Sequence, residues 1–187
     1  YDAHSHFEEQ VYQTSIIKNT TIIRAIRIFN AIMMTLMWAI LYYNVVVYRK
    51  TDIRNMLVLY RYFTQWGMFF TTFTVFLSVF ITPGAQIKRR NKYGCFQLWK
   101  WFNFFFQLAV LFEFVITPFF WAILYGIMPR KETFLGNFGE TIDHSLPLFC
   151  LLLEYFFCSS LPFIRHQFPC IVFIAFVYLL INLEYTK

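Results

Sequence analysis

Five long stretches of this chain are apolar and almost free of charge, and this pattern constrains the fold more than any other feature. They cover residues 28–48, 62–82, 101–128, 146–164 and 168–183. The hydrocarbon core of a bilayer is about 30 Å thick, so a spanning helix needs roughly 20 apolar residues. The first four stretches reach this length or come close, and the fifth is short. The sequence therefore predicts an all-α, polytopic transmembrane helical bundle with about five spanning helices.

Two patterns favour helices over the strands of a membrane barrel. The apolar stretches are continuous, whereas barrel strands alternate apolar and polar residues over about ten positions. Tyr and Trp also gather near the ends of the stretches, as they do at both interfaces of a bilayer. The residues concerned are Tyr42, Tyr43, Tyr48, Tyr60, Tyr62, Trp99, Trp101, Tyr125 and Tyr185.

Composition agrees with a membrane location. Hydrophobic residues make up 59% of the 187 residues and charged residues only 14%, whereas a soluble domain carries about 25% charged residues. The net charge of +6 comes from basic residues that stand mostly in short clusters between the apolar stretches. Such clusters indicate contact with anionic lipid headgroups. Membrane lipids are the expected partners, and nucleic acid is not.

The chain divides into two regions. Residues 1–30 are predicted to form a polar N-terminal arm that becomes basic towards its end, and residues 31–187 form the transmembrane domain. The arm fits an amphipathic helix lying on the membrane, and it equally fits a segment that binds a partner protein.

Two carboxylates stand alone inside predicted spans. Glu113 is the only charged residue of the third stretch and Glu154 the only one of the fourth. A buried charge is costly in a membrane, so each should be protonated, hydrogen-bonded or facing a polar cavity. A proton or substrate site and a hydrogen bond to a neighbouring helix or subunit both remain open. Glu113 shares a helical face with Thr117 and Trp121, which are its candidate neighbours.

A stripe of small and hydroxyl residues marks the second stretch. Its members recur at intervals of three and four residues, which places them on one face of a helix. The stripe comprises Thr64, Gly67, Thr71, Thr74 and Ser78. Such stripes let helices approach closely in lipid. Thr64 differs from the rest because it lies near the start of the span, within reach of interfacial water.

Thr64 and His144 form the candidate catalytic pair. The second and fourth spans run in the same direction, and both residues lie near the entry ends, so they share one leaflet. A Thr hydroxyl needs a base to become a nucleophile, and His is the usual base near neutral pH. Such a pair could attack the ester carbonyl of a lipid. The structural alternative for His144 is an ordinary interface residue. Glu154 lies about 15 Å deeper than His144 at ~1.5 Å per residue, so it is not the acid that orients His144.

The cysteines suggest neither a metal nor a redox role. The four cysteines contain no pair with CxxC spacing, and we interpret them as small apolar residues. No cofactor or metal is expected.

Three motifs resemble one known family. Residues 62–67 read Tyr-Phe-Thr-Gln-Trp-Gly, residues 115–121 read Val-Ile-Thr-Pro-Phe-Phe-Trp, and His144 is followed ten residues later by Glu154. In this order they resemble the androgen-induced/steroid-reductase-like membrane family, which includes the rolling-stone proteins. Some members of that family hydrolyse fatty-acid esters of hydroxy fatty acids with a Thr nucleophile and a His. The resemblance implies these roles for Thr64 and His144.

The chain also departs from that family's pattern. The family has six spans, whereas only five are found here, and residues 142–145 read Ile-Asp-His-Ser instead of a His-rich segment. A second hypothesis therefore stands beside the hydrolase. The protein could be a non-catalytic, supernumerary or structural subunit of a large membrane complex, for instance in the mitochondrial inner membrane. For an integral membrane protein of either kind, that membrane and the endoplasmic reticulum both remain open.

Overall fold

The structure is a computed structural model that describes Ile17 and residues 19–44, 63–81, 98–127, 134–158 and 168–185. These residues are almost entirely helical and include no strand, which confirms the all-α prediction. Most of the expected N-terminal arm, residues 1–16 and 18, lies outside the described residues.

The helices overlap all five predicted stretches, although the first and the fourth helical stretch begin earlier than predicted. In chain order they are α2 (Thr20–Tyr42), α3 (Phe63–Phe80), α4 (Leu98–Phe119), η3 (Phe120–Leu124), α5 (Tyr125–Ile127), α6 (Phe134–Asp143), α7 (Leu146–Leu153), η4 (Glu154–Cys158) and α8 (Phe168–Tyr185). Four continuous helical stretches are long and apolar enough to cross a membrane: Thr20–Tyr42, Phe63–Phe80, Trp101–Ile127 and Gly136–Cys158. An apolar helix, α8, occupies the place of the fifth predicted span.

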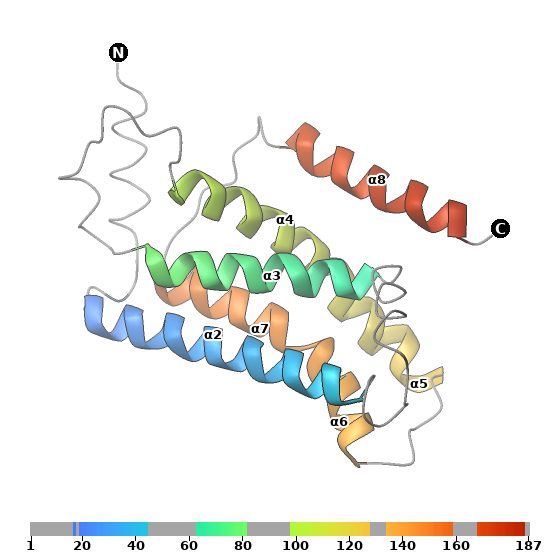
Figure 1. Ribbon diagram of the computed structural model, residues 1–187, viewed down its shortest axis with the longest axis horizontal. Coiled ribbons are helices and arrows are strands. Elements are labelled where there is room, and N and C mark those ends of the chain that lie inside the picture. The colour runs from blue at the N-terminus through green and yellow to red at the C-terminus, as the bar shows by residue number, and fades with distance from the viewer. Residues whose placement is uncertain are drawn as a thin grey trace.

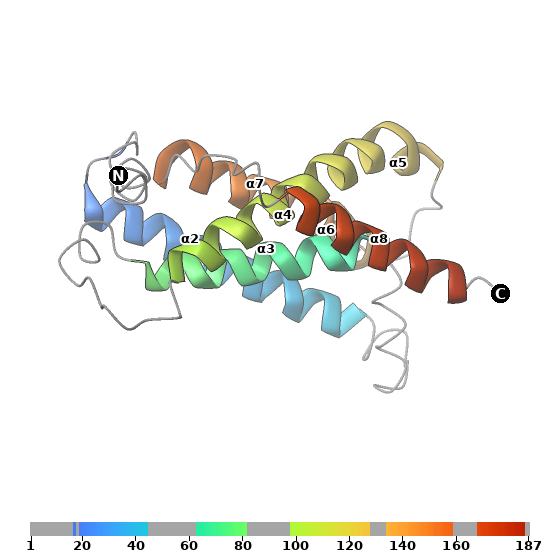
Figure 2. The same cartoon turned by 90° about the horizontal axis from the view of Figure 1, so that it is seen from above.

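The long helices run in alternating directions, with α3 in the middle of the bundle (Figures 1 and 2). Helix α3 contacts α2, α4 and α7. We call one end of the bundle the Arg27 end; there α2 and α4 begin, and α3 and η4 finish. At the opposite end, which we call the His144 end, α2 finishes, α3 begins, and α6 leads into α7 (Figure 1).

The first helix begins at Thr20, eight residues before the predicted start at residue 28. Asn19 caps it, because its side-chain oxygen accepts a hydrogen bond from the backbone N–H of Thr21 at 2.9 Å, and Asn is a favoured N-cap. The helix also runs without a break across the expected boundary between residues 30 and 31. Hydropathy places the start too late, because it treats the charged Arg27 as lying outside the span. The Arg27 side chain is in fact buried.

A proline reshapes the last part of the third span. Pro118 lies inside α4 and has no N–H to donate to the preceding turn. The wider π-helical turn η3 follows at once, and such turns often compensate for an interrupted hydrogen-bond ladder. This π-helical turn contacts the α6–α7 turn, because Phe120 stacks on His144 and Trp121 donates to Ser145.

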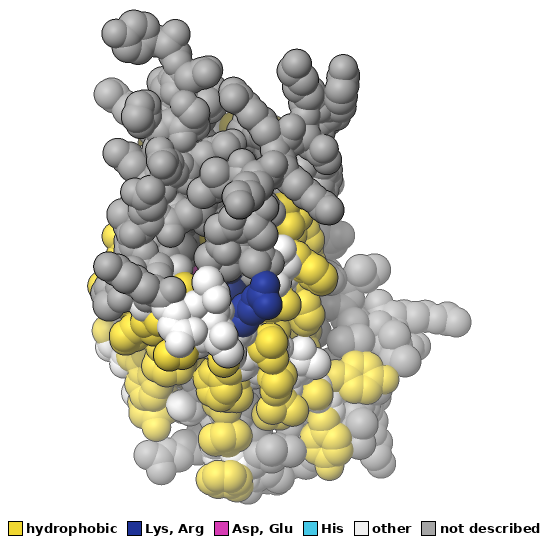
Figure 3. All heavy atoms as spheres, turned by 90° about the vertical axis from the view of Figure 1, so that its left-hand side faces the viewer, with side chains coloured by type: hydrophobic (Ala, Val, Ile, Leu, Met, Phe, Trp, Pro, Cys, Tyr) yellow, Lys and Arg dark blue, Asp and Glu magenta, His cyan; other side chains and the backbone are white. Residues whose placement is uncertain are grey.

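Apolar side chains both fill the bundle and cover it. One core cluster lies between α3 and α4 around Phe70, Phe106 and Phe112, and another joins α2, α3 and α7 around Met34 and Met68. Large apolar side chains are also exposed along all the long helices, as a lipid-facing surface requires. Seen from the Arg27 end, one small basic patch is visible among the described residues, with hydrophobic side chains below and beside it (Figure 3).

Candidate functional site

The polar stripe of α3 faces inward. Gly67, Thr71, Thr74 and Ser78 are buried, and Thr64 is half-buried. The Thr74 hydroxyl donates to the carbonyl of Phe70 at 2.8 Å and the Ser78 hydroxyl to that of Val75 at 2.7 Å. These two hydroxyls are satisfied within their own helix, which agrees with a packing role.

Thr64 lies in the first turn of α3, beside an aromatic wall. The ring of Phe63 stacks on Phe112 of α4 with centroids 4.5 Å apart, and it also contacts Tyr178 of α8 at 4.9 Å. Trp66 meets Tyr178 edge-on at 5.8 Å. Helices α4 and α8 thus flank the turn of α3 that carries Thr64.

His144 is held by the end of the third span. It lies in the turn between α6 and α7, and its ring stacks on Phe120 with centroids 3.8 Å apart and an interplanar angle of 12°. The neighbouring Ser145 hydroxyl accepts a hydrogen bond from the indole N–H of Trp121 at 3.0 Å. The π-helical turn η3 therefore contacts both the imidazole of His144 and the hydroxyl of Ser145.

Thr64 and His144 lie at the same end of the bundle, as their spans' directions predicted. Helix α4 connects the two regions, because it packs against α3 and is followed by Phe120, which stacks on His144. Their catalytic pairing stays a prediction.

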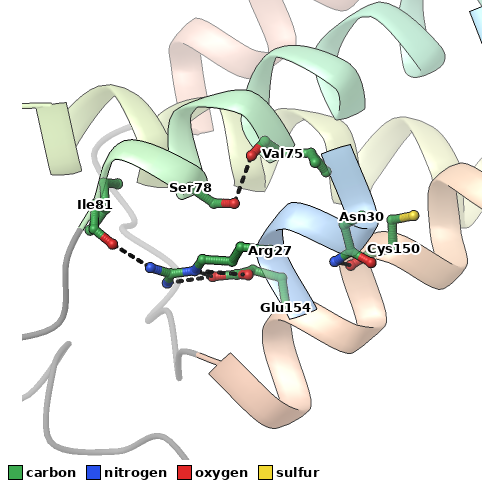
Figure 4. Close-up of polar contacts among 7 residues, drawn as sticks. All are labelled: Arg27, Asn30, Val75, Ser78, Ile81, Cys150 and Glu154. Carbon is green, nitrogen blue, oxygen red and sulfur yellow. Dashed lines mark hydrogen bonds and ion pairs between the residues drawn. The ribbon is translucent and has the colours of Figure 1, made fainter. Parts of the chain in front are cut away.

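Glu154 belongs to a different site, at the Arg27 end. Its carboxylate receives hydrogen bonds from Arg27 Nη2 at 2.7 Å and Arg27 Nε at 3.0 Å, and the two side chains are only 3–4% exposed. Arg27 Nη1 also donates to the carbonyl of Ile81 at 2.5 Å (Figure 4). One arginine therefore connects α2, the end of α3 and η4. This is the structural alternative foreseen for Glu154, a hydrogen bond to a neighbouring helix, and it leaves His144 at the opposite end.

Arg27 and Asn30 are polar contacts that the sequence interpretation missed, because both were assigned to the arm. Asn30 Nδ2 donates to the carbonyl of Cys150 in α7 at 3.2 Å. A signal was present in the spacing. The buried residues of α2 recur every three or four positions, and both polar residues fit the series: Ile23, Arg27, Asn30, Met34, Met37 and Leu41.

Glu113 has a markedly different environment from Glu154. Its side chain is fully buried, and within the described part of the chain neither carboxyl oxygen makes a hydrogen bond of regular geometry. Thr117, predicted as a neighbour, is the polar side chain beside it. Trp121, the other predicted neighbour, instead bonds Ser145.

The described residues contain no group of three or more His, Cys, Asp or Glu side chains arranged to hold a metal ion. Cys150, Cys158 and Cys170 are free thiols.

Fold and composition together define a polytopic, helical integral membrane protein. Comparisons of the chain with known protein families, with curated proteins and with solved structures find no match.

Proposed function

We propose that this protein is a membrane-embedded lipid-ester hydrolase in which Thr64 is the nucleophile and His144 the general base. The observation that carries the proposal is that both residues lie at the His144 end, where α3 begins and where Phe120, just after α4, stacks on His144. Its second support is the ordered set of motifs that resembles a family with Thr- and His-dependent members.

The proposed reaction has two steps. Thr64 Oγ1 attacks the acyl carbonyl of the ester while His144 accepts the hydroxyl proton, which gives a tetrahedral oxyanion. The oxyanion collapses, the C–O bond to the alcohol breaks, and His144 protonates the leaving alkoxide. Water then attacks the acyl-threonine, again with His144 as base, and releases the fatty acid.

The surroundings of Thr64 suit an apolar substrate. Phe63, Phe112 and Tyr178 provide an aromatic wall along which an acyl chain can lie. Catalytic hydrogen bonds are often long or absent until substrate is bound, so the proposal places the Thr64–His144 bond in the complex with the ester.

The test is hydrolysis of a fatty-acid ester of a hydroxy fatty acid by the full chain in lipid nanodiscs. Thr64→Ala should reduce turnover to background and Thr64→Ser should retain it. His144→Ala should lower turnover by about 10²- to 10⁴-fold, the range for loss of a general base. Thr74→Val is the matched control, because that hydroxyl serves its own helix. Full turnover by Thr64→Ala would contradict the proposal.

A second candidate is a non-catalytic subunit of a membrane complex. It is favoured by the chain's departures from the family pattern, which are five predicted spans instead of six and Ile-Asp-His-Ser at residues 142–145. Purification of the tagged chain in mild detergent separates the two. A subunit should co-migrate with a large assembly, for example from the mitochondrial inner membrane, and show no ester turnover. An enzyme should be active as a small particle.

A further inference from the structure

Gly67 lets α3 and α4 approach each other closely where they cross. A Cβ placed on Gly67 would lie 2.5 Å from Glu113 Oε1 and 2.6 Å from Ile116 Cδ1, which is nearer than real Cβ contacts allow. The Glu113 carboxyl therefore rests directly against the backbone of α3. Thr64 lies three residues before Gly67, on the same face of the helix.

Two buried polar groups at this crossing lie beside each other, and neither makes a hydrogen bond of regular geometry among the described residues. One is the Glu113 carboxyl and the other is the Thr117 hydroxyl, one helical turn further along α4. A threonine in a helix commonly donates to the carbonyl four residues earlier, as Thr74 does, but Thr117 does not. Glu113 can donate to the Thr117 hydroxyl oxygen, but the Thr117 proton is then still without an acceptor among the described residues. Buried polar groups of native proteins are almost always hydrogen-bonded, so a ligand oxygen would complete the set.

The register of the two helices places Thr117 at the level of Thr64. Gly67 contacts Glu113 and Ile116, and α3 and α4 are antiparallel (Figure 1). From that contact, Thr64 is three residues towards the His144 end on α3, about 4.5 Å, and Thr117 is up to four residues towards it on α4, at most about 6 Å. Three residues beyond Thr117 comes Phe120, on which His144 stacks. Along the bundle, Thr117 is therefore at about the level of Thr64 and about one helical turn from the residue that stacks on His144.

We propose that Thr117 binds the ester carbonyl, donating its O–H to the carbonyl oxygen and then to the oxyanion, and that Glu113 positions the Thr117 hydroxyl. This inference rests on the hydrolase proposed above, and it supplies the donor for developing negative charge that acyl transfer requires. A carboxyl group in hydrocarbon is far less costly as the neutral acid than as the anion. As the neutral acid Glu113 donates to Thr117 Oγ1, which directs the Thr117 proton to the substrate.

The charges at the crossing fit this assignment. The buried ion pair of Arg27 and Glu154 lies at the opposite end of the bundle. A donor chain of a carboxylic acid and a hydroxyl stabilises an oxyanion without a buried permanent charge.

The test is steady-state hydrolysis by the full chain in nanodiscs, with active molecules counted by covalent labelling of Thr64 with a fluorophosphonate probe. Thr117→Val keeps the shape and removes the donor. We expect its kcat to fall roughly 100-fold, the cost of one oxyanion donor, with KM little changed. Thr117→Ser should restore most of kcat. Thr74→Val again serves as the buried, same-shape control.

Variants of Glu113 test the positioning role. Glu113→Gln keeps a neutral group that can donate, and it should retain most of kcat. Glu113→Leu fills the space without a donor and should lower kcat towards the value of Thr117→Val. The double variant Thr117→Val/Glu113→Leu should be no slower than Thr117→Val alone, because the two groups act in series. A purely structural role would predict instead that the losses multiply and appear in the fraction of labelled molecules.

Two outcomes overturn the proposal, and they differ from each other. If the wild type hydrolyses the ester and Thr117→Val matches it in kcat, the role of Thr117 is wrong while the hydrolase stands. If the wild type neither turns over the ester nor labels at Thr64, the hydrolase is wrong and the role of Thr117 falls with it.

Discussion

The two intramembrane glutamates are equally buried and differ in their partners. Glu154 is paired with Arg27, whose guanidinium also binds a backbone carbonyl of a third segment. Glu113 lies against a glycine with no regular hydrogen bond among the described residues. A satisfied ion pair holds helices together, whereas an unsatisfied acid keeps the capacity to bind something else. The contrast indicates structural cohesion at the Arg27 end, and the proposed chemistry lies in the half of the bundle that contains the His144 end.

The largest effect is expected when one member of the ion pair is removed, which tests whether the pair stabilises the bundle. Arg27→Met leaves Glu154 buried without its partner, and such a loss costs about 3–5 kcal/mol of unfolding free energy. Glu154→Leu should cost a similar amount for the same reason. Reversible unfolding in mixed detergent micelles, followed by circular dichroism, measures both.

The double variant Arg27→Met/Glu154→Leu controls this experiment. With both charges gone, stability should return to within about 1–2 kcal/mol of the wild type, because a well-packed apolar pair of similar volume can replace a buried ion pair. Ester turnover should persist, since the pair lies at the other end from Thr64. A double variant as unstable as either single one would contradict the assignment.

The next largest effect is expected at Gly67. Gly67→Ala forces a methyl group against Glu113 and Ile116, and overpacking of this kind costs about 1–3 kcal/mol. It should also displace Glu113 and lower kcat. Gly126→Ala is the matched control, because a Cβ there meets nothing within 4 Å. Equal stability of the two variants would show that α3 and α4 can separate at their crossing without loss.

The smallest effect concerns a hydrogen bond that lies outside both glutamate sites. The Trp38 indole N–H donates to Thr72 Oγ1 at 2.8 Å, between α2 and α3. Trp38→Phe should cost about 0.6 kcal/mol beyond the lost ring volume, the average for a side-chain hydrogen bond between membrane helices. A double-mutant cycle with Thr72→Val isolates that value. A coupling energy near that of the Arg27–Glu154 pair would remove the energetic distinction between the ion pair and ordinary interhelical contacts.

Sequence reasoning located the helices well and the charged contacts poorly. Four spans and the apolar fifth helix were predictable, because length and absence of charge are properties of a single segment. The start of α2 was missed, because Arg27 was taken as the edge of the membrane. Its charge is tolerated inside the bundle only because Glu154, 127 residues further along the chain, lies beside it.

The candidate site shows the same division. That Thr64 and His144 share one end follows from the alternating direction of successive spans, which the sequence fixes by counting helices. The contact between Phe120 and His144 depends on the π-helical turn after Pro118. The position of Thr117 along the bundle, relative to Thr64, depends on the contact between Gly67 and Glu113. Both are contacts between different helices, so neither can be predicted from one segment alone.

The amino-acid sequence was enough to predict a helical bundle in a membrane. The backbone N–H and C=O groups of a long apolar segment must hydrogen-bond within that segment in lipid, and a helix does this. Only the tertiary structure decided which buried acid is neutralised by an arginine and which is left against a glycine. Helix packing sets that choice, because it selects which distant side chains meet where water is excluded.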